Sequence, residues 1–157
     1  LVHGMNVMLG YYKNDEATAA TLDKDGWYHT GDLGVMDEEG NIFIKGRSKN
    51  MLLGANGQNI YPEEIEDKLS SLPFVTECVL IQKDDKLYGL VYTDPDEKKS
   101  AGLSDAMLEA QMEENRIELN KIVPSYARVH ALRLVPEEFE KTPKKSIKRY
   151  LYMNYPV

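Results

Sequence analysis

Residues 46–66, GRSKNMLLGANGQNIYPEEIE, constrain the fold more than any other stretch of the chain. Pro62 suits the first position of a helix, and the two glutamates after it complement the positive end of the helix dipole. The preceding turn has little side-chain bulk and many amide groups. It suits a close approach by an uncharged ligand or another backbone, although a plain hairpin turn is the simpler reading. Its members are Gly54, Asn56, Gly57, Gln58 and Asn59.

Residues 1–47 are predicted to be a partial all-β segment of a larger N-terminal domain. Two alternating apolar runs joined by Asp-Glu-Glu-Gly predict a hairpin over residues 33–47, with Gly40 available for positive φ. Asn14 or Asp15 is expected to cap a short alanine-rich helix before it. Because the chain begins without methionine inside what looks like a strand, we expect it to be a piece of a longer protein.

Residues 48–157 are predicted to form a small α+β domain, in which helices pack on a short antiparallel sheet. Strands are expected over residues 74–82 and 86–93, where a tight turn would join them as an antiparallel pair. A third strand is expected over residues 128–135, because apolar and polar residues alternate there. The boundary between the two domains is therefore placed between residues 47 and 48.

The same domain is predicted to contain three helices. The first starts at Pro62, and Ile65, Leu69 and Leu72 form its apolar stripe. The longest starts near Ser104 and ends before Pro124, which cannot continue a helix. A short terminal helix is expected over residues 146–155.

Charge and hydropathy exclude several classes of function. The net charge is −7, whereas a nucleic-acid-binding protein ordinarily presents a basic face, so no nucleic-acid partner is expected. No apolar run approaches the roughly 20 residues of a membrane span, and no segment has the anatomy of a signal peptide. We therefore expect a cytoplasmic protein without a transmembrane segment.

Residues 141–149 are an exception to the acidic balance, because five of these nine residues are basic. They suit either a solvated surface or a phosphate-facing segment.

Cysteine and histidine offer little chemistry in this chain. Cys78 lies in the apolar run FVTECVLI and is predicted to be a small buried hydrophobic residue, not a nucleophile or a ligand. His3, His29 and His130 have no metal-ligand spacing with one another or with Cys78. The sequence therefore predicts no metal site in the chain.

The motif HTGD places a carboxylate at a tight turn. Gly31 lets the backbone turn, and Asp32 follows just after an aromatic pair, Trp27 and Tyr28. A fixed carboxylate can accept hydrogen bonds from the two vicinal hydroxyl groups of a ribose, although capping the turn is the simpler role. Antiparallel pairing returns the hairpin to its start, so Arg47 is predicted to lie within side-chain reach of Asp32. The alternative for Arg47 is a surface arginine paired with an acid.

The order and spacing of these motifs resemble the adenylate-forming enzymes, the superfamily of acyl-CoA synthetases, luciferases and peptide-synthetase adenylation domains. The shared pattern, GYY…GWYHTGDLG…DEEGNIFIKGRSKNM…NIYPEEIE, runs over nearly the whole chain. Between Arg47 and the PEEIE helix there is one residue more than in the common pattern, which is similar to long-chain fatty acyl-CoA synthetases. The resemblance implies the C-terminal part of an ATP-dependent acid–thiol ligase. Such an enzyme converts fatty acid, ATP and CoA to acyl-CoA, AMP and pyrophosphate through an acyl-adenylate.

The resemblance also implies roles for the matching residues. Asp32 would bind the ribose hydroxyls of ATP and of the acyl-adenylate, and Arg47 would hold the same nucleotide. Lys49 falls at a hinge about which the C-terminal domain turns between two half-reactions. Mg²⁺ is expected to be bound mainly by the protein's own N-terminal domain. The channel for the pantetheine arm of CoA would be lined by Gly54, Asn56, Gly57, Gln58 and Asn59.

One position departs from the family pattern Lys-Thr-x-x-Gly-Lys-Ile-x-Arg. The chain has KTPKKSIKR, so alignment on the Ile-x-Arg ending puts Ser146 where the family has the lysine that stabilises the α-phosphate. The catalytic role then passes to the adjacent Lys145, with Lys144 and Lys148 as alternatives. Adenylation could also be weakened while thioester formation is kept.

Two other functions stay open at this point. An acyl-adenylate-forming ligase of the same class could load an acyl carrier protein in place of CoA, or the chain could be a non-catalytic relative that only docks partners. The family's phosphate loop and acyl pocket lie in the N-terminal domain. We therefore expect these residues alone neither to hydrolyse ATP nor to activate an acid, and acyl chain length is not predicted.

Overall fold

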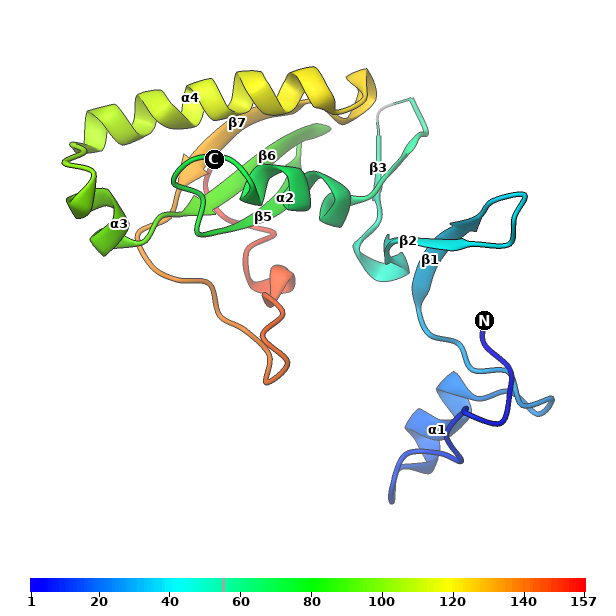
Figure 1. Cartoon of the computed structure of the whole chain (residues 1–157). Helices are drawn as coiled ribbons and strands as arrows, with labels where there is room; N and C mark the ends of the chain where they lie inside the picture. Colours follow the sequence, from blue (N-terminus) through cyan, green and yellow to red (C-terminus); the bar gives the residue numbers. More distant parts are fainter. Residues whose placement is uncertain (55) are drawn as a thin grey trace. The chain divides into compact units, whose positions relative to one another are not determined.

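The computed structural model describes residues 1–54 and 56–157, and the chain forms two compact units, Leu1–Lys49 and Asn50–Val157 (Figure 1). The domain boundary predicted between residues 47 and 48 remains a prediction for the longer protein. Each unit has its own strands and helices. Among the described residues, no helix is long and apolar enough to cross a membrane.

The first unit contains one short helix and a hairpin. Helix α1 (Asp15–Thr21) is capped by Asn14, whose side chain accepts a hydrogen bond of 2.9 Å from a backbone N–H in the first turn. Strands β1 (Asp32–Met36) and β2 (Ile42–Arg47) pair antiparallel, as the sequence predicts. Gly40 in the turn between them has φ +87°, which glycine adopts without strain.

The β1–β2 hairpin has no core of its own. No described residue of the first unit is buried, and several apolar side chains of the hairpin are at least half exposed. Burial of apolar surface is the main favourable term in folding, so this unit contributes little of it by itself. The exposed apolar residues of the hairpin are Val35, Met36, Ile42, Phe43 and Ile44.

The second unit begins with a glycine-rich hairpin, residues 52–60. A 3₁₀ turn, Ser48–Asn50, comes before it in the chain. Strands β3 (Leu52–Leu53) and β4 (Asn59–Ile60) pair antiparallel on either side of the hairpin tip. Helix α2 (Pro62–Ser70) follows directly, with its proline at the start and with Ile65 and Leu69 buried, as predicted. The helix ends before Leu72, the third residue of the predicted stripe, which packs partly buried against the same core.

A three-stranded sheet in the order β5-β6-β7 forms the centre of the second unit. β5 (Glu77–Lys83) and β6 (Lys86–Tyr92) are the predicted antiparallel pair, and the α+β class is confirmed. β7 (Val129–Leu134) joins β6 in parallel, so the sheet is mixed and the prediction of a wholly antiparallel sheet is wrong for this strand. Parallel neighbours need a long crossover, usually helical. The crossover contains α3 (Pro95–Ser100), α4 (Asp105–Ile122) and a 3₁₀ turn (Ser125–Ala127).

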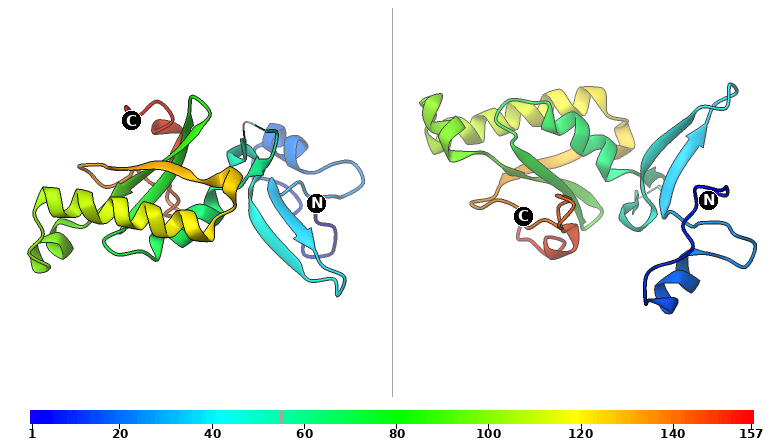
Figure 2. Two further views of the ribbon diagram at one scale, coloured as in Figure 1. Left: turned by 90° about the horizontal axis from the view of Figure 1, so that it is seen from above. Right: turned by 60° about the horizontal axis from the view of Figure 1, so that its bottom comes forward.

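Both faces of this sheet are covered (Figure 2). Helices α2 and α4 pack on one face, and the segment after β7 packs on the other. A fully buried aliphatic side chain contributes roughly 1.5–3 kcal/mol relative to an exposed one, so these two cores hold the second unit together. The first core includes Leu69, Leu80 and Leu119. The second core includes Val79, Ile81 and Leu90.

The terminal helix predicted over residues 146–155 is wrong. Residues 141–147 instead form a small loop, called the basic hairpin below, whose two ends are joined by an isolated antiparallel bridge. Only Arg149–Leu151 forms a 3₁₀ turn after it. Ile147 and Tyr152 pack against the second core, so burial of these side chains overrides the local helical preference.

Candidate functional site

Asp32 and Arg47 form an ion pair at the open end of the β1–β2 hairpin. They are register partners, and Arg47 Nη1 lies 2.9 Å from Asp32 Oδ1. The same nitrogen donates a hydrogen bond of 2.9 Å to the backbone oxygen of Thr30. Gly31, at φ +73°, makes the turn between these groups. The predicted proximity is confirmed, whereas the nucleotide-binding roles of the two residues remain predictions.

This ion pair is able to bind a hydroxylated ligand that carries negative charge. A carboxylate has about four acceptor positions, so one contact with Arg47 leaves Asp32 able to accept hydrogen bonds from hydroxyl groups. The Arg47 side chain is 61% exposed. Its remaining N–H donors therefore face solvent, where the planar guanidinium suits a phosphate oxygen.

Lys49 is the last residue of the first unit. It is exposed and lies in the 3₁₀ turn Ser48–Asn50. β2 ends at Arg47, so no continuous helix runs through residues 47–50. A short turn between two compact units is compatible with a hinge, and the hinge role of Lys49 remains a prediction.

The tip of the glycine-rich hairpin is closed by its own backbone. The N–H of Gly54 donates to the oxygen of Gln58, and the N–H of Gly57 donates to the oxygen of Gly54, both at 2.8 Å. Gly57 has φ +78°, and a Cβ on Gly54 would lie 3.3 Å from the oxygen of Gln58. These two hydrogen bonds bring Gly54 close to Gly57 and Gln58, so the hairpin tip is narrow at these residues. The side chains of Asn56, Gln58 and Asn59 are exposed around it.

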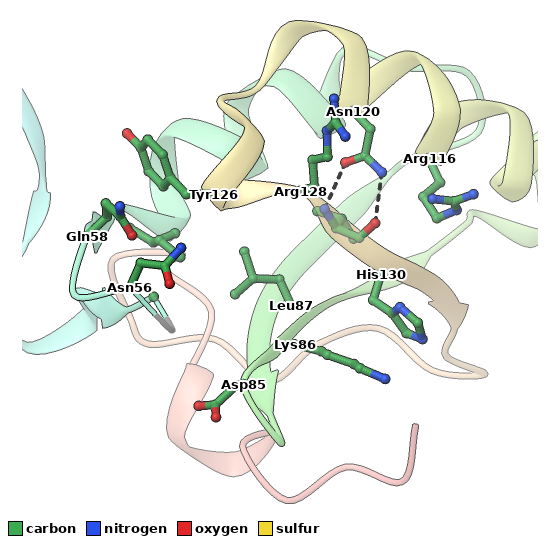
Figure 3. A pocket seen from close by; sticks show the side chains of 13 residues that line it. Asn56, Gln58, Asp85, Lys86, Leu87, Arg116, Asn120, Tyr126, Arg128 and His130 are labelled. Carbon is green, nitrogen blue, oxygen red and sulfur yellow. Dashed lines mark hydrogen bonds between the residues drawn. The ribbon is translucent and has the colours of Figure 1, made fainter.

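A hollow of about 390 Å³ opens beside the glycine-rich hairpin (Figure 3). Asn56, Gln58 and Tyr126 lie on one side of it, and Lys86 and His130 lie on the other. The hollow therefore joins the amide groups of the hairpin to basic side chains of the sheet.

Positive charge exceeds negative charge in this hollow. Asp85 is the only acidic residue among the described residues that line it. In the part of the chain that the structure describes, neither Lys86 nor Arg128 forms an ion pair. Arg116, by contrast, is held by Glu113 through hydrogen bonds of 2.8 and 2.6 Å. Two cations without an ion-pair partner, placed beside exposed amides, suit a phosphate attached to an uncharged, amide-rich chain.

Sequence reasoning missed the basic residues of this hollow. Lys86 begins β6, whereas Arg128 and His130 lie at the start of β7. Asn120 on α4 holds that start in place, since its side chain accepts from the N–H of Val129 and donates to its oxygen, both at 2.8 Å (Figure 3). No local pattern links these segments, so no signal in the sequence could have found the hollow.

Lys145 stands at the tip of the basic hairpin. Its N–H donates to the oxygen of Thr142, and the N–H of Thr142 donates to the oxygen of Ser146, both at 2.8 Å. Lys145 has φ +61°, a conformation that costs a non-glycine residue about 1–2 kcal/mol. Its side chain lines a shallow hollow that also contains acidic residues of α2 and β5. These acidic residues are Glu63, Glu66, Asp67 and Glu77.

The other lysines of this segment differ in their contacts. Lys148 Nζ donates to Glu140 Oε2 at 3.0 Å, and this hydrogen bond raises the pKa of Lys148. Lys148 is therefore committed to a partner in the folded chain. Lys144 is exposed next to Lys145. The geometry thus leaves Lys144 and Lys145 as the lysines at the hairpin tip, and the catalytic role of Lys145 remains a prediction.

The described residues provide neither a metal site nor a reactive thiol. Within residues 1–54 and 56–157, no group of three or more His, Cys, Asp or Glu side chains could hold a metal ion. Burial raises the pKa of the Cys78 thiol to about 12. Because the thiolate is the reactive form, Cys78 acts as a buried apolar residue, as predicted.

Sequence comparison finds similarity to acyl-activating enzymes and acid–CoA ligases. Residues 49–155 match the AMP-binding enzyme C-terminal domain family. The long-chain-fatty-acid–CoA ligase FadD15 of Mycobacterium tuberculosis is 32% identical over 95% of this chain and 28% of its own length. The probable acyl-activating enzyme 9 of Arabidopsis thaliana is 43% identical over 57% of this chain and 16% of its own length. The chain thus spans less than a third of the length of these relatives.

Solved structures share the fold. The adenylation domain of a carboxylate reductase from Mycobacterium chelonae has a TM-score of 0.80 at 22% identity, covering 94% of this chain and 24% of that one. O-succinylbenzoate coenzyme A synthetase from Bacillus subtilis, solved with AMP, has a TM-score of 0.66 at 25% identity, covering 94% and 28%. Since the family match extends over most of the residues, the chain belongs to the AMP-binding enzyme C-terminal domain family.

Proposed function

We propose that the chain is the C-terminal part of an adenylate-forming acid–CoA ligase, and that the acid is a long-chain fatty acid. The observation that carries the proposal is the Asp32–Arg47 ion pair in a member of this family. It brings together a carboxylate that can accept hydrogen bonds from hydroxyl groups and a guanidinium that can donate hydrogen bonds to a phosphate. The similarity to FadD15 over 95% of the chain supports a fatty acid as the substrate.

In the first half-reaction, a carboxylate oxygen of the fatty acid attacks the α-phosphorus of ATP and pyrophosphate leaves. Asp32 accepts hydrogen bonds from the ribose hydroxyls, and Arg47 donates to the same nucleotide. The ammonium of Lys145 stabilises negative charge on the α-phosphate. Electrostatic contributions of this kind amount to about 3–4 kcal/mol in the transition state.

In the second half-reaction, the thiol sulfur of CoA attacks the acyl carbon and AMP leaves. The narrow tip of the glycine-rich hairpin leaves room for the pantetheine arm, whose amides can pair with Asn56 and Gln58. Lys86 and Arg128 in the adjoining hollow bind phosphate groups of CoA. The two half-reactions use different hairpins of one unit, so a hinge at Lys49 allows each to act in turn.

A pair of lysine variants in the full-length enzyme tests the adenylation step. Lys145→Ala is expected to lower acyl-adenylate formation by about 100-fold or more, measured as pyrophosphate release. Thioester formation from supplied acyl-adenylate should stay near the wild-type rate. Lys144→Ala is the matched control at the neighbouring exposed position. An equal loss in the control, or loss of both half-reactions in Lys145→Ala, contradicts the assigned role.

The acyl acceptor is tested at the hollow. Removing one phosphate-binding cation with Arg128→Met is expected to raise KM for CoA about tenfold and to leave KM for ATP unchanged. Transfer to a holo acyl carrier protein, but not to CoA, would favour the carrier-loading alternative. A full-length protein that performs neither half-reaction would favour a docking relative.

A further inference from the structure

Arg149 joins three segments that are far apart in the sequence. Its Nη1 and Nη2 donate to the two carboxylate oxygens of Glu66 on α2, at 2.5 and 2.8 Å. Nη1 also donates to the backbone oxygen of Leu80 on β5 at 2.6 Å, and the N–H of Leu80 donates to Glu66 at 2.5 Å. These four hydrogen bonds between Arg149, Glu66 and Leu80 are called the Arg149 clamp.

The Arg149 clamp is largely shielded from water. The Arg149 and Glu66 side chains are 13% and 15% exposed. Paired hydrogen bonds between a guanidinium and a carboxylate fix direction as well as distance, and removing one partner from such a shielded pair is costly. The ion pair between Lys121 and Glu118 on α4 is more than half exposed on both sides, and pairs of that kind contribute little. The clamp therefore fixes geometry in a way that the surface pair does not.

The clamp extends to the first residue of the second unit. Asn50 Nδ2 donates to Glu63 Oε1 at 2.6 Å, and Arg149 Nη2 lies 4.0 Å from the same oxygen. Glu63 and Glu66 are neighbours on one face of α2, the helix that follows the glycine-rich hairpin. A continuous polar path thus runs from Asn50 through α2 to Arg149.

The basic hairpin is also attached to the second unit through its two ends. Lys141, at its start, forms an ion pair with Glu77 on β5. Ile147, at its end, packs against the second core, just before Arg149. Both ends of the hairpin that carries Lys145 are therefore fixed to the sheet, and only its tip is exposed.

We propose that Arg149 is a positioning residue that couples the basic hairpin to α2, to the glycine-rich hairpin and to Asn50, so that both hairpins turn as one body about Lys49. This inference rests on the proposed function, in which the two hairpins serve different half-reactions. A loose connection would let the residue after the hinge move without carrying Lys145 with it. A misplacement of about 1 Å at a catalytic group lowers the rate by about 100-fold.

Hydrogen exchange read by mass spectrometry tests the coupling in the full-length protein without turnover. Arg149→Met is expected to speed exchange of the amides in residues 141–147 at least about tenfold. Asn50→Ala should speed exchange in the same peptide by a smaller factor, because it frees Glu63. Lys121→Met, which removes the exposed pair on α4, is the matched control and should have no effect there. Unchanged exchange in Arg149→Met, or no response to Asn50→Ala, overturns the proposal.

Rates of the two half-reactions separate positioning from general stability. Arg149→Met should lower kcat for adenylation by about 100-fold with little change in KM for ATP, and Arg149→Lys should restore part of the loss. Equal loss of both half-reactions together with a lower Tm would show a merely structural role. If Arg149→Met does not fold, Glu66→Gln weakens the same contact at constant size. A wild-type enzyme without adenylation would refute the proposed function, while the exchange experiment would still decide the coupling.

Discussion

The two units of the chain bury apolar surface to very different extents. Among the described residues, every buried hydrophobic side chain lies in the second unit, where two cores cover both faces of a three-stranded sheet. In the first unit, the β1–β2 hairpin leaves Phe43 52% and Ile44 65% exposed.

Within these 157 residues, the Asp32–Arg47 pair is positioned without buried apolar side chains of its own unit. A single two-stranded hairpin is marginally stable in water, and an exposed pair such as Asp32–Arg47 adds little. The geometry of this pair therefore comes from the register of the hairpin and from the turn at Gly31. The Arg149 clamp, in contrast, is held in place by the core of the second unit.

The largest expected effect is a separation of the two unfolding transitions in the 157-residue chain. Trp27 is the only tryptophan and reports on the first unit, whereas far-UV circular dichroism is dominated by α2 and α4 in the second. In a urea titration, Trp27 fluorescence should change at lower urea than the dichroism signal. Coincident transitions would mean that the two units unfold together, which would contradict the lower stability expected for the first unit.

Matched truncations sharpen the comparison at the level of single side chains. Leu90→Ala in the second unit is expected to lower the free energy of unfolding by about 2–5 kcal/mol, because Leu90 is fully buried. Phe43→Ala removes a larger side chain from the first unit but should cost less than about 1 kcal/mol. Urea unfolding followed by circular dichroism measures the change in Leu90→Ala, and urea unfolding followed by Trp27 fluorescence measures the change in Phe43→Ala. Similar costs for the two variants would show that the hairpin packs more tightly than its exposure indicates.

The smallest expected effect is a gain of stability at the tip of the basic hairpin. Lys145→Gly should raise the free energy of unfolding by about 1 kcal/mol, since glycine adopts φ +61° without strain. The same variant should lose adenylation, because the cation is removed. Thermal unfolding of the 157-residue chain measures the gain of stability, and pyrophosphate release by the full-length enzyme measures the loss of adenylation. Lys144→Gly, at a residue without positive φ, is the control and should give no such gain.

Local sequence patterns were sufficient where interacting elements follow one another in the chain. The β1–β2 hairpin and the pairing of β5 with β6 both join neighbouring segments through short turns. The parallel pairing of β7 depends on a crossover of two helices, and periodicity carries no information about its direction. The helix predicted over residues 146–155 failed because contacts with the sheet override a local preference.

The candidate site shows the same difference between contacts of neighbouring segments and contacts of distant segments. The approach of Arg47 to Asp32 could be predicted, since antiparallel register brings the two ends of a hairpin together. The contact between Arg149 and Glu66 spans 83 residues, so no window of sequence reveals it. The uncommitted cations beside the glycine-rich hairpin were missed for the same reason.

β5 and β7 form the two outer strands of the sheet. One residue in each has its backbone N–H and oxygen hydrogen-bonded to side chains. Glu66 and Arg149 bind the N–H and the oxygen of Leu80, and Asn120 binds those of Val129. An open strand edge is a template on which another protein molecule can add a strand. Occupying these positions protects the sheet from intermolecular β-pairing on both sides, so variants that vacate them should aggregate more readily than the wild type.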